Sequence, residues 1–414
     1  MTLETPPQTS LIAASADRPG DDPIFALHAE AKARAAAGED VLDATLGALM
    51  EDDGRLSILP AVSEALRRVD PARAAAYAPI SGPPAYLDAV VRDLFGEGEL
   101  ARGAVAVATP GGTGAVHHAI VNFLEPGQKV LTTSYYWGPY GILAEHTRRG
   151  LETFRMFGAD GRFDAESFRA GLERHVDEQG RALVILNTPC HNPTGYSLDD
   201  AEWEAVVAIL LAAAERAPIA LLLDMAYVKF GAPGSDAWQR HVEKLRGQVT
   251  VLCAWTGSKA FAQYGSRIGA LVGVPRDEAE HGRIKNALGY SCRGTWSNCN
   301  HLGMLAITEL LSDPELRERS ERQRDEVRQL LSERVDTFNQ HAQAAGLRYP
   351  RYEGGFFVAV FTPDPVGTVE HMKQSGVFVV PLDGAVRLAL CATPRASVPR
   401  LVDSLAAGIR AVGG

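Results

Sequence analysis

Short apolar runs alternate with amphipathic segments between Arg102 and Val274. Each run has the length of a β-strand and is rich in Val, Ile or Leu, which is typical of strands buried in a parallel sheet. Helical patterns, such as the one over residues 198–216, lie between some of the runs. This alternation predicts a three-layer α/β domain. The runs cover residues 104–109, 129–134, 182–187, 219–224 and 250–255.

The pattern changes after Gly303, where a long, charged and amphipathic stretch extends to Gly346. It predicts a helix that is interrupted at Asp313–Pro314, because proline suits the first turn of a new helix. Further apolar runs then predict a smaller α/β domain; they cover residues 356–361, 377–381 and 386–391. We expect a mobile tail over 1–20, an arm over 21–48 that packs partly with the small domain, a large domain over 49–312 and a small domain over 313–414.

Composition and charge narrow the class of protein. The chain has 414 residues, 46% hydrophobic and 22% charged, as in an ordinary globular protein of two domains. Its net charge of −10 argues against a nucleic-acid partner, which needs a basic surface. No apolar run is long enough to span a membrane, and residues 1–20 lack the pattern of a signal peptide. The five cysteines form no C-x-x-C pair, which favours free thiols in a reducing cytoplasm and argues against a zinc site.

Chemically useful residues follow each of the first five runs. In open α/β sheets, ligands bind beyond the carboxyl ends of the strands, so these residues are expected to meet at one edge. The segments are PGGTGAV (110–116), YYWGPY (135–140), TPCHNPTG (188–195), MAYVKF (225–230) and TGSKAF (256–261).

The glycine-rich turn at 111–114 lies between a predicted strand and a predicted helix. Backbone amides at such a turn bind phosphate at the positive end of the helix. Taken alone, the turn fits a tight bend without a ligand equally well. A dinucleotide fingerprint is excluded, because His117 stands where G-x-G-x-x-G needs its third glycine.

Lys259 lies among small and apolar residues, eight positions before Arg267. Desolvation can keep a buried amine neutral and nucleophilic. A lone lysine is more often a surface charge, and a lone arginine is more often an ion-pair partner. With the hydroxyls of Thr256 and Ser258, however, these two side chains can form a phosphate clamp beside an amine. That combination fits a phosphorylated aldehyde cofactor.

An acidic residue, Asp224, ends a strongly apolar run. It is either a cap for the next turn or a buried counter-charge. Pyridoxal 5′-phosphate (PLP) needs such a counter-charge, because a carboxylate keeps the pyridine nitrogen protonated and the ring electron-withdrawing. Tyr227 can hydrogen-bond the ring oxygen. Trp137 can stack on the ring, although by itself it would be interpreted as a core residue.

Together these motifs resemble fold-type I PLP enzymes, and among them the class I aspartate and aromatic amino-acid aminotransferases. The resemblance covers nearly the whole chain. Its most specific part is HNPTG at 191–195 together with the Ser258-Lys259 pair and Arg267. The other matching segments are DPI (22–24), LGALMEDDGRLSILPAV (46–62), YAPISG (77–82), GGTGAV (111–116), DMAY (224–227), RGTWSNCNHLG (293–303) and VRLALC (386–391).

The resemblance implies a mostly parallel seven-stranded sheet in the large domain, PLP as cofactor and a homodimer with shared active sites. It implies that Lys259 carries PLP as a Schiff base and then moves protons. Asp224 is expected to pair with the ring nitrogen, and Asn192 and Tyr227 with the ring oxygen. The implied phosphate ligands are Gly112, Thr113, Thr256, Ser258, Arg267 and, from the neighbouring subunit, Tyr77.

For the substrate, the resemblance implies that Arg387 pairs with the α-carboxylate through its guanidinium fork. Gly47, Trp137 and Asn192 are expected to lie beside the substrate. Arg293 is expected to come from the partner subunit and to bind a side-chain carboxylate. That residue points to aspartate, glutamate and 2-oxoglutarate, and it does not exclude aromatic substrates.

Several positions depart from the family pattern. Tyr140 stands where a histidine is usual, so the support of Asp224 is expected to differ. Thr256 replaces a serine and keeps its hydroxyl, and Leu46 replaces a valine beside the substrate. The Asn192–Pro193 peptide bond is expected to be cis.

The leading hypothesis is an aminotransferase that exchanges an amino group between an amino acid and a 2-oxo acid. One alternative keeps PLP and the fold but changes the reaction to that of a decarboxylase, lyase or oxidase, which fold alone does not exclude. Another is a non-catalytic ligand-binding protein. The presence of every catalytic position disfavours this last class.

Overall fold

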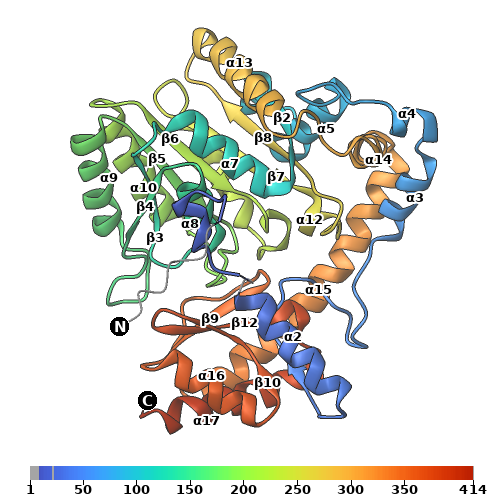
Figure 1. Ribbon diagram of the computed structural model, residues 1–414, viewed down its shortest axis with the longest axis vertical. Helices are drawn as coiled ribbons and strands as arrows, with labels where there is room; N and C mark the ends of the chain where they lie inside the picture. The colour runs from blue at the N-terminus through green and yellow to red at the C-terminus, as the bar shows by residue number, and fades with distance from the viewer. Residues whose placement is uncertain (1–8, 21–22, 414) are drawn as a thin grey trace.

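The apolar runs between residues 104 and 255 all form strands of one sheet. The computed structural model describes residues 9–20 and 23–413, and in that part the sheet has seven strands in the order β2-β8-β7-β6-β5-β3-β4. β8 runs antiparallel to both neighbours and the other pairs are parallel, so the predicted mostly parallel sheet is confirmed (Figure 1). The strands are β2 (Val105–Pro110), β3 (Lys129–Thr133), β4 (Gly150–Phe154), β5 (Ala182–Asn187), β6 (Ile219–Asp224), β7 (Thr250–Thr256) and β8 (Ile268–Val274).

Alternate residues of the central strands face two separate cores, because successive side chains of a strand point to opposite faces. On one face, Leu222 and Leu252 belong to a core with α7 (Gly111–Phe123), α8 (Pro139–His146) and α13 (Glu278–Gly294). On the other face, the core includes Leu221 and Val251. The helices of this second layer are α3 (Pro60–Arg68), α5 (Pro84–Phe95), α9 (Ala165–Gln179), α10 (Asp200–Ala214), α11 (Trp238–Glu243) and α14 (His301–Ser312).

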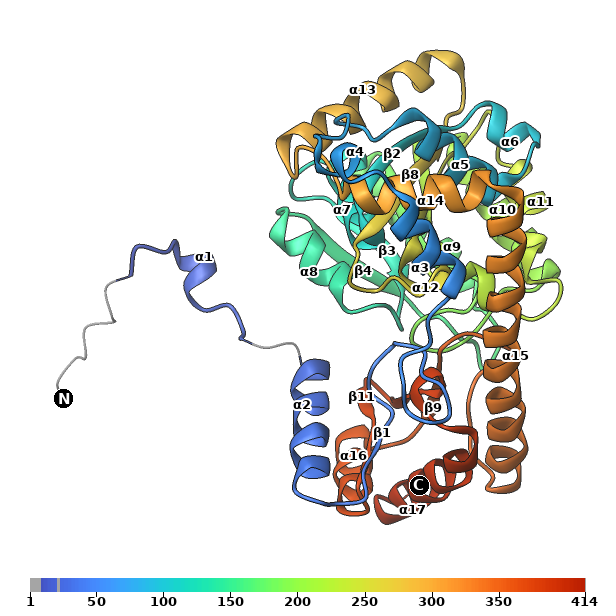
Figure 2. The same ribbon diagram turned by 90° about the vertical axis from the view of Figure 1, so that its right-hand side faces the viewer.

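Short helices complete the large body. They are α4 (Pro71–Ala75), α6 (Glu99–Arg102) and α12 (Gly257–Ala260). The long helix α15 (Pro314–Ala344) then leads from the large body into the smaller one (Figures 1 and 2). The predicted break is confirmed: Asp313 accepts hydrogen bonds from the backbone N–H groups of Glu315 and Leu316 at 2.9 and 3.1 Å and so caps the new helix.

The smaller body contains an antiparallel sheet in the order β11-β12-β9 and a parallel pair, β1-β10. The predicted run at 377–381 is divided between β10 (Val377–Phe378) and β11 (Val380–Leu382), while β9 (Phe357–Phe361) and β12 (Ala385–Ala389) follow the other runs. The helices are α2 (Pro23–Ala36), α16 (Pro365–Gln374) and α17 (Val398–Ala411), and β1 (Leu42–Asp43) joins the arm to β10. Since α15 runs along both bodies, the boundary at residue 313 stays a prediction.

Residues 9–20 contain the short helix α1 (Ala13–Ala16) and lie away from the large body (Figure 2). The tail that the sequence predicts to be mobile covers residues 1–20. Residues 1–8 of that tail, and 21–22 of the arm, lie outside the described residues, and the mobility stays a prediction. In the described ranges no helix combines the length and the apolar character that crossing a membrane requires.

Candidate active site

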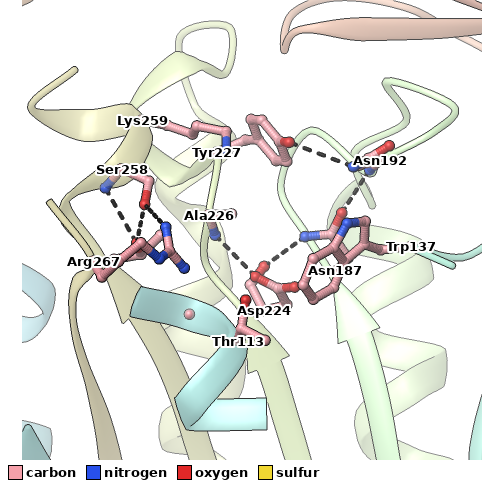
Figure 3. Close-up of a pocket in the computed structure, with 12 residues that line it drawn as sticks. Thr113, Trp137, Asn187, Asn192, Asp224, Ala226, Tyr227, Ser258, Lys259 and Arg267 are labelled. Atoms are coloured by element: carbon pink, nitrogen blue, oxygen red, sulfur yellow. Dashed lines mark hydrogen bonds between the residues drawn. The ribbon is translucent and has the colours of Figure 1, made fainter. Parts of the chain in front are cut away.

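A cavity opens at the carboxyl edge of the parallel strands (Figure 3). The cavity and its mouth hold about 560 Å³ of empty space, part of which is open to solvent. Two of its lining residues, Asn187 and Ala226, were not among the predicted site residues. The predicted residues that line it are Gly112, Thr113, Trp137, Asn192, Asp224, Tyr227, Thr256, Ser258, Lys259 and Arg267.

One part of the cavity has the features of a phosphate site. Helix α7 begins there at Gly111, whose φ is 71° and whose added Cβ would lie 2.3 Å from Arg267 Nη2. Because Gly111 has no side chain, the Arg267 guanidinium has room beside the start of α7. Arg267 Nη1 donates to Ser258 Oγ at 3.4 Å, and the Ser258 N–H donates to Thr256 Oγ1 at 3.1 Å. Helix amides, hydroxyls and a guanidinium thus converge, as binding of an anion requires.

Lys259 extends into the cavity from α12, directly after β7 (Figure 3). Its Nζ lies 5.7 Å from the centroid of the Tyr227 ring and 5.3 Å from that of the Tyr264 ring. Burial among these groups lowers the pKa of the Lys259 amine from 10.5 to about 8. A larger fraction of this amine is therefore neutral near pH 7 than of a surface lysine, and the neutral amine is the nucleophile.

Asp224 ends β6 with only 6% of its surface exposed. Its Oδ2 accepts a hydrogen bond from the Tyr140 hydroxyl at 2.6 Å, and its Oδ1 accepts one from the Ala226 N–H at 3.2 Å. Burial raises the pKa of Asp224, while these two donors and the charge of Lys259 act in the opposite direction. Asp224 is therefore both a cap for the following turn and a buried acid. A cationic N–H placed in the cavity would stabilise its charged form.

Asn187 connects Asp224 with the loop that carries Asn192. Its Nδ2 donates to the Asp224 carbonyl oxygen at 2.8 Å, and its Oδ1 accepts from the Asn192 N–H at 2.5 Å (Figure 3). Asn192 Nδ2 in turn donates to the Tyr227 hydroxyl at 3.4 Å. The Asn192–Pro193 bond is cis, as predicted. Both Asn192 and Tyr227 thus present polar atoms to the same side of the cavity.

Arg387 and Gly47 do not line this cavity, and the structure brings them together beside it. Arg387 lies on β12, is 6% exposed and donates from Nη2 to the Thr45 carbonyl oxygen. Its guanidinium stacks over the ring of Phe357, with 4.5 Å between the guanidinium carbon and the ring centroid. An added Cβ on Gly47 would lie 2.5 Å from Cζ of the same ring. Phe357, which no sequence motif singled out, therefore packs against both predicted substrate residues.

Tyr77 and Arg293 lie outside the cavity of their own chain. The Tyr77 side chain is 92% exposed. Arg293 is in the last turn of α13, also exposed, and donates to Ser297 Oγ at 2.7 Å. Neither residue completes the site of a single chain.

The lining residues fit PLP. The first turn of α7, the hydroxyls of Thr256 and Ser258 and the Arg267 guanidinium form a place for a phosphate. An amine of lowered pKa and a buried acid lie within the same cavity. An aldehyde next to the amine, and a ring nitrogen next to the acid, would each meet a matching partner. The sequence assigned the same residues to this cofactor.

Comparison with known proteins points to one family. The family model for class I and II aminotransferases matches residues 39–405. An aspartate aminotransferase of Pseudomonas aeruginosa is 29% identical over 377 residues, which is 87% of this chain and 90% of that protein. An aminotransferase from Anaerococcus prevotii is 31% identical, with a TM-score of 0.92 over 97% of this chain and 100% of that one.

An aromatic-amino-acid aminotransferase from Burkholderia pseudomallei, with pyridoxal phosphate covalently bound, shares the fold. Its TM-score is 0.81 at 24% identity, over 96% of this chain and 100% of that one. The family model covers most of the chain, and the three-layer architecture agrees with it. The chain therefore belongs to the class I and II aminotransferases and is a PLP-dependent enzyme that transfers amino groups.

Proposed function

We propose that the protein exchanges an amino group between aspartate, glutamate or an aromatic amino acid and a 2-oxo acid such as 2-oxoglutarate. One observation carries the proposal: Lys259, Asp224 and the phosphate-binding turn line a single cavity, with Arg387 on the adjacent small body. When bound, PLP supplies an electron-withdrawing ring that stabilises negative charge at the substrate Cα.

The phosphate of the cofactor would be held by the amides of Gly112 and Thr113, the hydroxyls of Thr256 and Ser258, and the guanidinium of Arg267. The Asp224 carboxylate would hold the proton at the ring nitrogen. Asn192 and Tyr227 would donate hydrogen bonds to the ring oxygen, and Trp137 would stack on the ring. Each of these residues lines the cavity, which supports the assignment.

Lys259 would bind the cofactor at rest. When its amine is free, Lys259 would move a proton between the substrate Cα and the cofactor beside it. A pKa of about 8 suits both directions of this transfer, because the amine gains and loses a proton easily near neutral pH.

Arg387 would bind the α-carboxylate of the substrate as a bidentate partner. Its position is supported by the Phe357 ring beneath it and by the Thr45 carbonyl oxygen, which together restrict the guanidinium. Gly47 would lie over the substrate, where any side chain would meet the same ring.

The protein would act as a homodimer in the cytoplasm. A second copy would cover the exposed Tyr77 and would bring Tyr77 to the phosphate and Arg293 to a side-chain carboxylate of the substrate. The exposed Leu11 and Ile12 of the N-terminal tail would find apolar partners on that copy. The free thiols of all five cysteines fit a reducing compartment.

The test is a single-turnover reaction of the holoenzyme with glutamate. We expect the absorbance of lysine-bound cofactor to convert to that of the amine form, with one 2-oxoglutarate released for each site. A decarboxylase would release carbon dioxide, a lyase would release ammonia without an acceptor, and an oxidase would consume oxygen. Release of carbon dioxide or ammonia, or consumption of oxygen, would contradict the proposal.

A further inference from the structure

The hydroxyl of Tyr140 reaches the acid of the cavity from a different layer of the fold. Tyr140 lies in the first turn of α8, where Pro139 begins the helix, and it is 1% exposed. Its hydroxyl donates to Asp224 Oδ2 at 2.6 Å across 84 positions of sequence. This is a short hydrogen bond to a group that can carry charge, and such bonds are stronger than neutral ones.

The surroundings of Tyr140 restrict the direction of this hydroxyl. The Tyr140 N–H donates to the Trp137 carbonyl oxygen at 2.9 Å. The Trp137 ring meets the Tyr140 ring edge-on at 5.5 Å, and the Tyr136 ring is nearly parallel to it at 6.5 Å. Trp137 itself lines the cavity. One turn of chain therefore places both the ring-stacking residue and the partner of Asp224.

Asp224 depends on its donors to remain charged. Burial raises its pKa, so the uncharged acid gains in stability, and the hydrogen bond from Tyr140 is the largest of the effects that act against this. Burial also raises the pKa of Tyr140 well above 10, so its hydroxyl keeps its proton throughout the range in which the enzyme can work. Asp224 thus accepts a hydrogen bond from a hydroxyl that keeps its proton over the working pH range.

Other titratable groups on the surrounding elements do not replace this donor. Burial lowers the pKa of His118 on α7, and of His191 in the loop after β5, to about 3, so both rings are neutral. It raises the pKa of Cys253 on β7 to about 12. Tyr227 keeps its proton for the same reason, and the charge of Lys259 lowers the pKa of Asp224 less than the hydrogen bond from Tyr140 does.

We propose that Tyr140 is a positioning residue, whose hydroxyl orients Asp224 toward the ring nitrogen of the cofactor and maintains its negative charge. The resemblance leads one to expect a histidine at this position, so a neutral donor here replaces one that titrates. The inference rests on the proposed function, since it concerns the same acid.

The experiment compares Tyr140→Phe with Tyr136→Phe, which removes a hydroxyl from the neighbouring ring of the same segment. Three quantities are measured for each: the dissociation constant of PLP from the apoenzyme, the absorbance of bound cofactor against pH, and the pH profiles of kcat and KM. In Tyr140→Phe we expect PLP affinity and kcat to fall about tenfold or more, with little change in KM. The acidic limb of the kcat profile should move to higher pH, because the pKa of Asp224 rises. Tyr136→Phe should match the wild type.

Tyr140→His restores a donor and should recover most of the lost affinity, which a purely space-filling role of the ring would not explain. Unchanged PLP affinity and pH profiles in Tyr140→Phe would overturn the inference, as would equal losses in both phenylalanine variants. If Tyr140→Phe does not fold, the test uses Tyr140→His instead. A folded Tyr140→His that binds PLP as weakly as Asp224→Asn would overturn the inference. A wild-type protein that does not bind PLP at all would instead refute the proposed function.

Discussion

At the scale of single residues, the proposed function depends first on Lys259. Lys259→Ala should abolish covalent attachment of PLP and reduce turnover to background, because no other amine lines the described cavity. The fold should persist, since within the described part of the chain the Lys259 side chain forms no ion pair with another element. Absorbance spectra, activity and circular dichroism check this, with the exposed Lys244→Ala as control. Normal turnover in Lys259→Ala would mean that the central assignment is wrong.

The lowered pKa of Lys259 has its own consequence. Only the neutral amine attacks the aldehyde, and it predominates above a pKa of about 8. The rate of PLP capture by apoenzyme should therefore rise with pH up to about 8 and level off above it. Rapid-mixing absorbance measurements from pH 6 to 10 would show this. A rate that keeps rising beyond pH 9 would indicate an ordinary lysine.

In the proposed function, Asp224 controls how strongly the cofactor ring withdraws electrons. Asp224→Asn should still bind PLP through the phosphate site but remove the Cα proton several orders of magnitude more slowly, because the amide does not hold the charge at the ring nitrogen. Isotope exchange at Cα measures that step directly. An unchanged exchange rate would exclude the assigned role.

Arg293 tests substrate choice. A charge-assisted bidentate contact contributes about 1.5–3 kcal/mol, which corresponds to roughly ten- to hundredfold in kcat/KM. Arg293→Ala should lose that factor for aspartate and glutamate and much less for phenylalanine or tyrosine. Arg283→Ala, on the same helix, serves as the control. Equal losses for all substrates would make Arg293 a structural residue.

At the scale of elements, the packing of β8 on the first turn of α7 shapes the phosphate site. An added Cβ on Gly269 would lie 2.5 Å from the backbone carbon of Gly111, which cannot move aside as a flexible side chain would. Gly269→Ala should therefore destabilise the apoenzyme by about 1–3 kcal/mol and weaken PLP binding.

Gly273→Ala is a matched control on the same strand, because its nearest neighbour would be a Leu252 side-chain atom at 3.4 Å. Thermal unfolding of both apoenzymes and PLP titrations compare the two. If the two variants behave alike, the contact between β8 and α7 does not shape the site.

At the scale of the whole molecule, the proposal of shared sites predicts complementation between subunits. A mixed dimer of Lys259→Ala and Arg293→Ala chains would contain one site with both residues intact. When isolated with two affinity tags, it should show about half the wild-type activity toward aspartate, although each parent dimer is impaired. If the mixed dimer only averages its two parents, each chain supplies its own Arg293.

Much of this architecture follows from the sequence alone. Runs of Val, Ile and Leu identify strands because a buried strand needs apolar side chains on both faces, and Asp313–Pro314 identifies a helix start through its cap. The sequence also predicts that Lys259 and Asp224 lie near each other, because the carboxyl ends of parallel strands meet at one edge of the sheet.

Other features depend on tertiary structure. The periodicity of apolar residues shows which face of a strand is buried, but it does not show which strand lies beside it. The pattern therefore does not predict that β8 lies between β2 and β7 and runs antiparallel to both. Asn187 and Phe357 resemble ordinary strand residues in sequence; only the packing places one beside Asp224 and the other beneath Arg387. The hydrogen bond between Tyr140 and Asp224 likewise exists because two layers meet there, and no local pattern encodes a distance of 2.6 Å between residues so far apart in the chain.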